Sequence, residues 1–243
     1  MDNDLLLLSG NDLPFIEAQV TIHQPTIKEI AYIGEEAFFT GCELINFSKN
    51  VLSEQDKMIL EKQTNFDILI AILKERNAVM QRNRNCVEMV LALIFPEYMI
   101  SIEDSIILKK DNERYEINNN NFDAFKNLFN TMFVFKKNAS KEYNPNGELA
   151  RKISEKLRKR QQKLNELKKQ KGQKINILTR YISILAVGEH KDINELMQYS
   201  VYQLYDEFER FKLKINNDIY FSAKMAGAKD LEEIEDWMKD IHS

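Results

Sequence analysis

The sequence predicts a mainly α-helical protein, and three observations lead to this prediction. Only seven Gly and four Pro occur among 243 residues, although sandwiches, barrels and Gly-rich phosphate-binding loops need these residues at their turns. Apolar residues recur at steps of three and four along most of the chain, which is typical of helices with one buried face. Only residues 15–22 and 99–117 have the character of strands. We therefore expect an N-terminal helical domain with a short strand and a small β-hairpin, a basic linker helix, and an all-helical C-terminal domain.

The first elements lie within residues 15–45. The segment FIEAQVTI at 15–22 favours a short strand. Thr26 and Glu29 have the spacing of a capping box, which predicts that a helix begins there. Gly34 and Gly41 are unfavourable inside a helix, so we expect a break or a close crossing with another helix near them. The apolar positions of this helix are Ile27, Ile30, Ala31, Phe38, Cys42 and Ile45.

The rest of the N-terminal part predicts more helices around one hairpin. Helix starts are indicated at 53–56 and 64–67 by residues that commonly cap helices. The almost entirely apolar run 86–95 predicts the central, most buried helix. Residues 99–117 alternate in a hairpin-like manner around a polar turn. The four consecutive Asn at 118–121 favour a turn and the start of a helix that extends to Met132.

The net charge of −4 conceals a strong asymmetry along the chain. Residues 141–174 contain twelve Lys/Arg and four Glu, a net of +8, so the remainder carries −12. The preceding polar stretch contains Pro145 and Gly147 and is the best linker candidate. We therefore divide the chain into an N-terminal domain over 1–135, a linker and basic helix over 136–174, and a C-terminal domain over 175–243.

The basic segment 148–171 predicts a long amphipathic helix with a heptad-like apolar seam. The seam residues are Ala150, Ile153, Leu157, Leu164 and Leu167. Three interpretations stay open: a helix that packs on a partner, a nucleic-acid contact, and a solvated spacer. The cations that would neutralise phosphates are Lys156, Arg158, Lys159 and Arg160. Tyr143 is the one aromatic residue between 141 and 174, so the stacking platform of a single-strand binder is missing.

The C-terminal part predicts four helices. The first covers 175–187, and the second follows a capping-box pattern at 192–195. Asn216-Asn217 indicates a turn before the third helix, which we expect to end near Gly227. Asp230 indicates the start of a last, acidic helix.

The sequence lacks the local signatures of common enzymes. GxGxxG, GxxxxGK[ST], GxSxG and HExxH do not occur, so we expect no enzymatic activity, no cofactor and no metal. Cys42 and Cys86 lie on apolar faces and are expected to be inert core thiols, and so few cysteines favour a reducing compartment. No secretory signal and no membrane-spanning segment is evident. These observations favour a cytoplasmic binding protein.

Two stretches carry a resemblance to a known family. They are HQPTIKEIAYIGEE at 23–36, and DEFERF at 206–211 continuing to KMAGAKDLEE at 224–233. They resemble tail assembly chaperones of long-tailed phages and prophages of Gram-positive bacteria. The resemblance implies a protein of the host cytoplasm that binds the tape measure protein, recruits major tail tube protein subunits, and is absent from the mature virion. Self-association is also open, whereas membrane and nucleic acid are not expected as partners.

The partner-binding residues are hypothesised from apolar helix faces that could cover a helical partner. They are Ile27, Ile30, Phe38, Ile153, Leu157, Leu164, Leu167 and Trp237. For each of these faces, an internal core is the alternative, and for Trp237 we favour a residue that pins the last helix to the core over one that anchors a partner. Two other functions stay open: a nucleic-acid-associated phage protein that uses the basic helix 148–171, and a structural virion protein.

Overall fold

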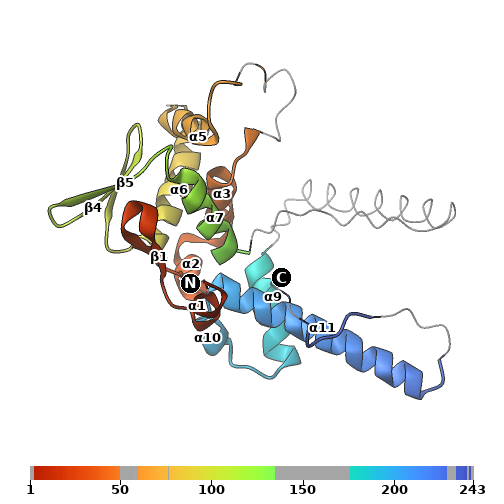
Figure 1. The fold of residues 1–243 in the computed structure, drawn as a ribbon. Helices are drawn as coiled ribbons and strands as arrows, with labels where there is room; N and C mark the ends of the chain where they lie inside the picture. The colour runs from red at the N-terminus through yellow and green to blue at the C-terminus, as the bar shows by residue number, and fades with distance from the viewer. Residues whose placement is uncertain are drawn as a thin grey trace.

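The computed structural model describes residues 3–49, 58, 60–75, 77–134, 176–228, 234–239 and 241. Within these residues the fold is mainly α-helical with two small antiparallel sheets (Figure 1), which confirms the predicted fold class. The helices before the linker are α1 (Asn3–Ser9), α2 (Ile27–Ile33), α3 (Glu35–Ile45), α5 (Asn65–Lys74), α6 (Ala78–Ile94) and α7 (Phe122–Met132). The helices after it are α9 (Ile177–Gly188), α10 (Ile193–Leu196) and α11 (Val201–Met225). The strands are β1 (Leu13–Phe15), β2 (Val20–Ile22), β3 (Met99–Ile102), β4 (Ile106–Lys110) and β5 (Glu113–Ile117).

Local chemistry sets the helix starts at α2 and α5, and both predictions are confirmed. Thr26 Oγ1 accepts a hydrogen bond from the Glu29 backbone at 3.2 Å, and the Glu29 carboxylate accepts one from the Thr26 backbone at 2.7 Å. Thr64 and Asp67 form the same reciprocal pair at 3.1 and 2.9 Å. Each capping box satisfies backbone N–H groups that have no partner within the helix. The helix start predicted at 53–56 lies outside the described residues.

The two glycines of the first helical stretch have different roles. Gly34, at φ 87°, separates α2 from α3. Gly41 lies where α3 crosses α6, because a Cβ added there would come within 2.5 Å of the Cys86 carbonyl oxygen. Both the predicted break and the predicted close crossing are therefore confirmed. The central position of α6 is also confirmed, since Val90 and Ile94 are fully buried.

The aromatic residues of α7 fill the centre of the N-terminal part. The Phe125 ring contacts four other rings, with centroid distances between 5.7 and 6.2 Å. These rings belong to Phe15, Phe95, Phe122 and Phe129. The apolar spacing predicted for this helix thus corresponds to its buried face, and α7 begins directly after the Asn run as expected.

The prediction of one strand at 15–22 is wrong. Strands β1 and β2 form a hairpin in which Leu13 pairs with Ile22, and the 3-10 turn η1 (Ile16–Ala18) joins them. Gln19 adopts a left-handed conformation at φ 57°, so the chain reverses within the segment. The apolar residues alternate on each short strand separately, which a single longer strand does not explain.

The hairpin predicted over 99–117 is extended by one strand. Strands β4 and β5 pair around a tight turn at Asp111, which has φ 54°. Strand β3 adds to the other side of β4 in an antiparallel order β3-β4-β5. This meander extends away from the helices (Figure 1). Ile102, Ile106, Leu108 and Ile117 are its buried residues that belong to the hydrophobic core.

The C-terminal helices differ from the prediction in three places. The second predicted helix is interrupted, because α10 ends at Leu196 and Ser200 caps a new helix. The turn predicted at Asn216-Asn217 is wrong, since α11 continues through both residues and ends before Gly227 as expected. The last predicted helix is also wrong over 234–239, which is irregular and lies beside α11. Residue Asp230 lies outside the described residues.

The described residues before and after the linker share one hydrophobic core. The Tyr199 carbonyl accepts a hydrogen bond from the Ile27 backbone at 2.8 Å. Gln203 Nε2 donates to the Leu8 carbonyl at 2.8 Å, and the Glu35 carboxylate accepts from the backbone of α9 at 2.9 Å. The first turns of α9 and α11 are therefore anchored to the N-terminal helices. The division at 136–174 stays a prediction, because that range lies outside the described residues.

Candidate partner-binding surface on helix α11

Three of the partner-binding residues hypothesised from the sequence are core residues. Ile27, Ile30 and Phe38 are almost completely buried. They belong to the hydrophobic core shared by both parts of the chain. These three residues therefore form part of the internal core, which was the alternative to partner binding. They offer no surface to a partner in this conformation.

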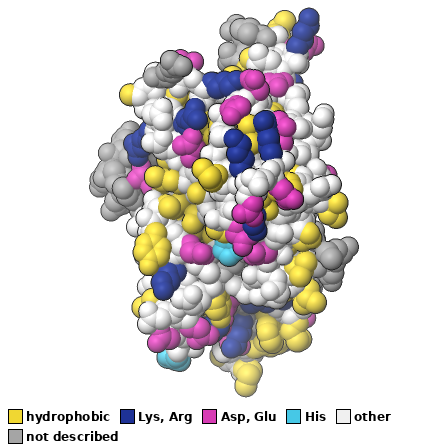
Figure 2. Space-filling model, turned by 90° about the vertical axis from the view of Figure 1, so that its left-hand side faces the viewer, with side chains coloured by type: hydrophobic (Ala, Val, Ile, Leu, Met, Phe, Trp, Pro, Cys, Tyr) yellow, Lys and Arg dark blue, Asp and Glu magenta, His cyan; other side chains and the backbone are white. Residues whose placement is uncertain are grey.

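The structure does not test whether the predicted basic helix 148–171 packs on a partner or contacts nucleic acid. Ile153, Leu157, Leu164 and Leu167, together with Lys156, Arg158, Lys159 and Arg160, lie outside the described residues. On the face that carries the β3–β5 sheet, Figure 2 shows Lys and Arg side chains interspersed with Asp and Glu. That face has the character of an ordinary solvated surface.

Helix α11 carries a continuous apolar stripe whose two halves have different surroundings. The stripe follows steps of three and four along the helix. Its members are Val201, Leu204, Phe208, Phe211, Ile215 and Ile219. Val201 and Leu204 are buried in the core, whereas 38% of Ile215 and 62% of Ile219 is exposed. The stripe therefore continues beyond the part of the helix that the core covers.

Helix α9 explains where the cover ends. The ring of Tyr181 stacks on Phe208 with 3.8 Å between centroids. A Cβ added to Gly188, the last residue of α9, would lie 2.2 Å from the Phe211 ring. Beyond this point α11 projects from the rest of the described fold (Figure 1). Ile215 and Ile219 lie on the projecting half, one and two turns past the end of α9.

More apolar side chains are exposed near the projecting end. Phe221 and Met225 are more than half exposed, on a different side of the helix from Ile215 and Ile219. Single exposed apolar residues are common on protein surfaces, but a group of them on one projecting element indicates an interaction site. We define the α11 surface as Ile215, Ile219, Phe221 and Met225.

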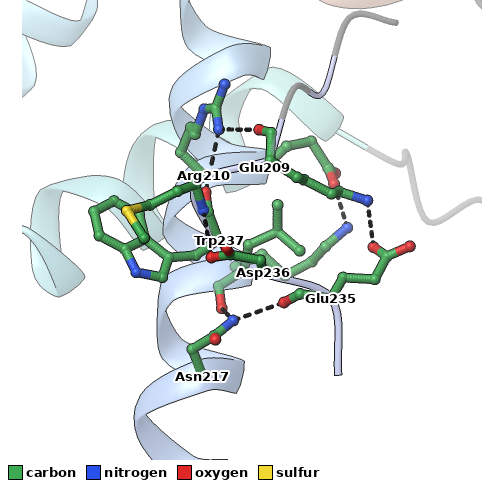
Figure 3. Close-up of polar contacts among 10 residues, drawn as sticks. Glu209, Arg210, Asn217, Glu235, Asp236 and Trp237 are labelled. Atoms are coloured by element: carbon green, nitrogen blue, oxygen red, sulfur yellow. Dashed lines mark hydrogen bonds and ion pairs between the residues drawn. The ribbon is translucent and has the colours of Figure 1, made fainter. Parts of the chain in front are cut away.

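The C-terminal segment 234–239 lies against α11 on the side of Leu213 and Asn217, and its Ile234 and Glu235 share a small depression with Ile219. Arg210 donates hydrogen bonds to the carbonyls of Trp237 and Lys239 at 3.1 and 2.5 Å. Asn217 Nδ2 donates to the Glu235 carbonyl at 2.8 Å and to that of Leu213 at 3.0 Å. Figure 3 shows both side chains pointing from α11 to the segment.

Trp237 lies at the rim of a cleft of about 520 Å³. The residues that line the cleft are Leu8, Glu189, Tyr199, Gln203, Asp206, Glu207, Arg210, Phe211, Lys214 and Trp237. The indole is 42% exposed, so Trp237 is neither a core residue nor a fully exposed anchor. The favoured core role of Trp237 is therefore not seen, and its contact with a partner stays a prediction.

An ion-pair cluster connects the α9–α10 loop with α11 at this cleft. Lys191 pairs with Glu207 and donates to the Tyr199 hydroxyl at 3.1 Å. Burial acts to lower the pKa of Lys191, but its contacts with Glu207 and Tyr199 raise it above the ordinary lysine value. Burial and the neighbouring Glu207 carboxylate raise the pKa of Glu189. The cluster therefore holds the α9–α10 loop on α11.

The described ranges contain no group of three or more His, Cys, Asp or Glu arranged to hold a metal ion. No helix of the described structure has the length and hydropathy needed to cross a membrane. Cys42 and Cys86 are buried free cysteines, as predicted, and burial raises the pKa of the Cys42 thiol well above its usual value. A buried thiol with a raised pKa is a poor nucleophile.

Residues 168–242 match the family model of the YomV second domain, which belongs to a phage-derived protein family known from a Bacillus prophage. This part of the chain therefore resembles a phage-related family. The matched range includes α9, α10, α11 and the C-terminal segment, so the whole α11 surface lies within the part that resembles the YomV second domain. No curated protein and no solved structure gives a match.

The sequence contained a signal for the α11 surface that its interpretation missed. The apolar spacing from Phe208 to Ile219 continues without interruption, but a turn was expected at Asn216-Asn217. Arg210 and Asn217 gave no local signal at all, because their role depends on a segment that follows them by 18 or more residues.

Proposed function

We propose that this protein is a phage tail assembly chaperone that binds the tape measure protein and recruits tail tube subunits during tail morphogenesis. The observation that carries the proposal is the uncovered continuation of the apolar stripe on α11, within the phage-related part of the chain. The resemblance of residues 23–36 and 206–233 to tail assembly chaperones supports the same function.

The proposed mechanism is reversible covering of apolar surface. A long tape measure helix exposes apolar stripes that associate with one another when they are left in water. Ile215 and Ile219, at i and i+4, present the spacing that packs against such a helix. Burying apolar surface contributes a free energy of roughly 25 cal/mol per Å². The exposed part of the stripe consists of only two isoleucines, so it supports an interaction that can be released when tube subunits arrive.

Co-expression with the tape measure protein of the same phage tests the proposal. We expect the wild-type chain to keep the tape measure protein soluble and to elute with it. The double variant Ile215→Ser/Ile219→Ser should lose the complex, because it removes the stripe while both positions are exposed in the free protein. Absence of a complex with the wild-type chain would contradict the proposal.

A matched control separates the stripe from general loss of surface hydrophobicity. Ile16 and Ile193 are exposed isoleucines outside the stripe. The double variant Ile16→Ser/Ile193→Ser should retain the complex. The proposed function also places the protein in the host cytoplasm and outside the mature virion, so mass spectrometry of purified particles should not detect it.

A further inference from the structure

We propose that Glu189 and Glu207 form a proton-operated clasp, in which one proton shared by their carboxyl groups holds the α9–α10 loop on α11 and the loss of this proton releases the loop. The inference goes beyond the proposed function, because it concerns how the fold responds to pH and is tested on the protein alone. The clasp lies at the cleft of about 520 Å³ that both glutamates line.

One buried carboxylate oxygen of the clasp lacks a donor when both glutamates are ionised. Lys191 Nζ pairs with Oε1 of Glu207, whereas Oε2 of Glu207 is buried and receives no hydrogen bond from a donor in the described part of the chain. A buried oxygen without a donor is costly. The Glu189 carboxyl lies within hydrogen-bonding reach of Glu207, and once protonated it can donate to this oxygen. A proton on Glu189 therefore completes the clasp.

The electrostatics of the cleft favour this proton. Burial and the hydrogen bond with Glu207 raise the pKa of Glu189, and the charge of Glu207 adds to the rise. Lys191, whose Nζ lies 4.0 Å from the Glu189 carboxylate, and Lys214 act in the opposite direction. Because the folded pKa is raised above 4.5, the contribution of the clasp is complete below pH 4.5 and is lost as the pH rises through the folded value.

Other charged and titratable groups surround the clasp on the loop and on α11. Tyr199 accepts a hydrogen bond from Lys191 Nζ at 3.1 Å, and Arg210 donates to main-chain carbonyls of the segment 234–239. The α1 residue at the cleft is apolar, since it is Leu8. The full set of neighbouring groups is His190 and Lys191 on the loop, Tyr199 before α11, and Asp206, Arg210 and Lys214 on α11.

The loop continues directly from the end of α9, so release of the clasp reaches that helix. Glu189 is the C-cap of α9, and His190 has φ 56°, the left-handed conformation with which helices commonly end. Gly188 lies against the Phe211 ring, because an added Cβ would come within 2.2 Å of it. Once the loop is released, the last turn of α9 can move away from Phe211. The apolar stripe of α11 would then be exposed from Phe211 onward.

Hydrogen exchange followed by mass spectrometry tests the clasp on the full-length protein. The reporter is the last turn of α9, where the Glu189 amide donates to the Leu185 carbonyl at 2.9 Å. After correction for the intrinsic pH dependence of exchange, the wild type should lose protection here as the pH rises from about 4.5 to about 8. Glu189→Gln carries an amide that donates to Glu207 at every pH, so it should keep its protection. Glu195→Gln is the matched control, because it removes an exposed carboxylate from the neighbouring α10, and it should behave as the wild type.

Two further variants distinguish a shared proton from a simple ion pair. Lys191→Met removes a cation that lowers the pKa of Glu189, so the loss of protection should move to higher pH. Glu207→Gln removes the carboxylate that raises this pKa, so the loss should move to lower pH. Far-UV circular dichroism checks that both variants fold, and the comparison of the wild type with Glu189→Gln decides the matter if either does not.

Two results would overturn the proposal. The first is protection of the last turn of α9 that does not change with pH in the wild type. The second is a Lys191→Met protein that is unprotected at every pH, together with a Glu189→Gln protein that behaves as the wild type. In that case the ion pair of Lys191 with Glu207 alone holds the loop, and no shared proton is involved.

Discussion

At the scale of single residues, Gly41 shows how one missing side chain allows two helices to cross. A Cβ at this position would lie 2.5 Å from the Cys86 carbonyl oxygen and 2.7 Å from the Val90 Cγ2 atom. A backbone carbonyl in a buried helix cannot move aside as a flexible side chain can. We predict that Gly41→Ala lowers the free energy of unfolding by about 3 kcal/mol, the cost of overpacking a core, as measured by urea denaturation.

The control for this prediction is a glycine that is needed for conformation rather than for space. Gly227 has φ 86°, and no atom lies within 4 Å of an added Cβ. Gly227→Ala should cost only about 1 kcal/mol, because the left-handed conformation is the single source of strain. If the two variants lose the same stability, the close crossing at Gly41 is not what makes alanine unfavourable there.

Residues whose roles are decided by near neighbours in sequence were predictable. Thr26 with Glu29, Thr64 with Asp67, and Gly34 follow rules that operate within one helical turn. Asn217 is the opposite case, because an Asn pair normally indicates a turn. Here the Asn217 amide is satisfied by a carbonyl 18 residues further along the chain, and no local rule contains that information.

At the scale of elements, the capping box of α2 gives stability that depends on pH. The Glu29 carboxylate accepts from the Thr26 backbone and hydroxyl at 2.7 and 2.8 Å. Burial acts to raise the pKa of Glu29, but these bonds and the nearby His23 lower it below the ordinary value of 4.5. Because the folded pKa is lowered, the contribution is complete above pH 4.5 and is lost as the pH falls through the folded value.

We therefore predict that the wild type loses stability between about pH 5 and pH 3, partly through Glu29. Glu29→Gln keeps an oxygen that accepts from Thr26 but cannot be protonated in this range. Its free energy of unfolding should be about 0.5 to 1 kcal/mol lower than that of the wild type at pH 7, and the difference should vanish near pH 3. Glu17→Gln, at an exposed position of η1, is the control. A difference that persists unchanged at pH 3 would show that charge on Glu29 is not responsible.

Element identity was more predictable than element limits. The apolar periods of α5, α6, α7 and α9 indicated real helices, because the apolar positions coincide with the buried faces of these helices. The failures occurred where chain reversal or continuation depends on backbone conformation. Gln19 turns within a segment that looks like one strand, and α11 passes through two Asn that look like a turn.

At the scale of the whole molecule, burial decided which apolar faces are available to a partner. Ile27, Ile30 and Phe38 have the same sequence pattern as the α11 stripe, yet they are buried. A helical period shows that a face is apolar, but it does not show whether the protein itself or a partner covers it. That distinction follows from where α9 ends along α11, which is a property of the assembled fold.

The shared core leads to a prediction about cooperativity. The hydrophobic cluster includes residues of α3 and α6 as well as Leu185 of α9, so a loss of packing in α9 should destabilise the N-terminal helices. We predict that Leu185→Ala lowers the free energy of unfolding by about 3 kcal/mol. The urea midpoint should fall equally when it is followed by far-UV circular dichroism and by labelling of Cys42 and Cys86, which are buried in α3 and α6.

The two thiols make this test specific, because they report opening of the part of the chain that does not carry the substitution. Leu5→Ala, at an exposed position of α1, is the matched control and should leave both midpoints in place. A Leu185→Ala protein whose dichroism midpoint falls while its thiol midpoint stays would show two independently folding domains. The expected common shift would show that the α11 surface is presented by a single cooperative body, so that a partner bound to α11 stabilises the N-terminal helices as well.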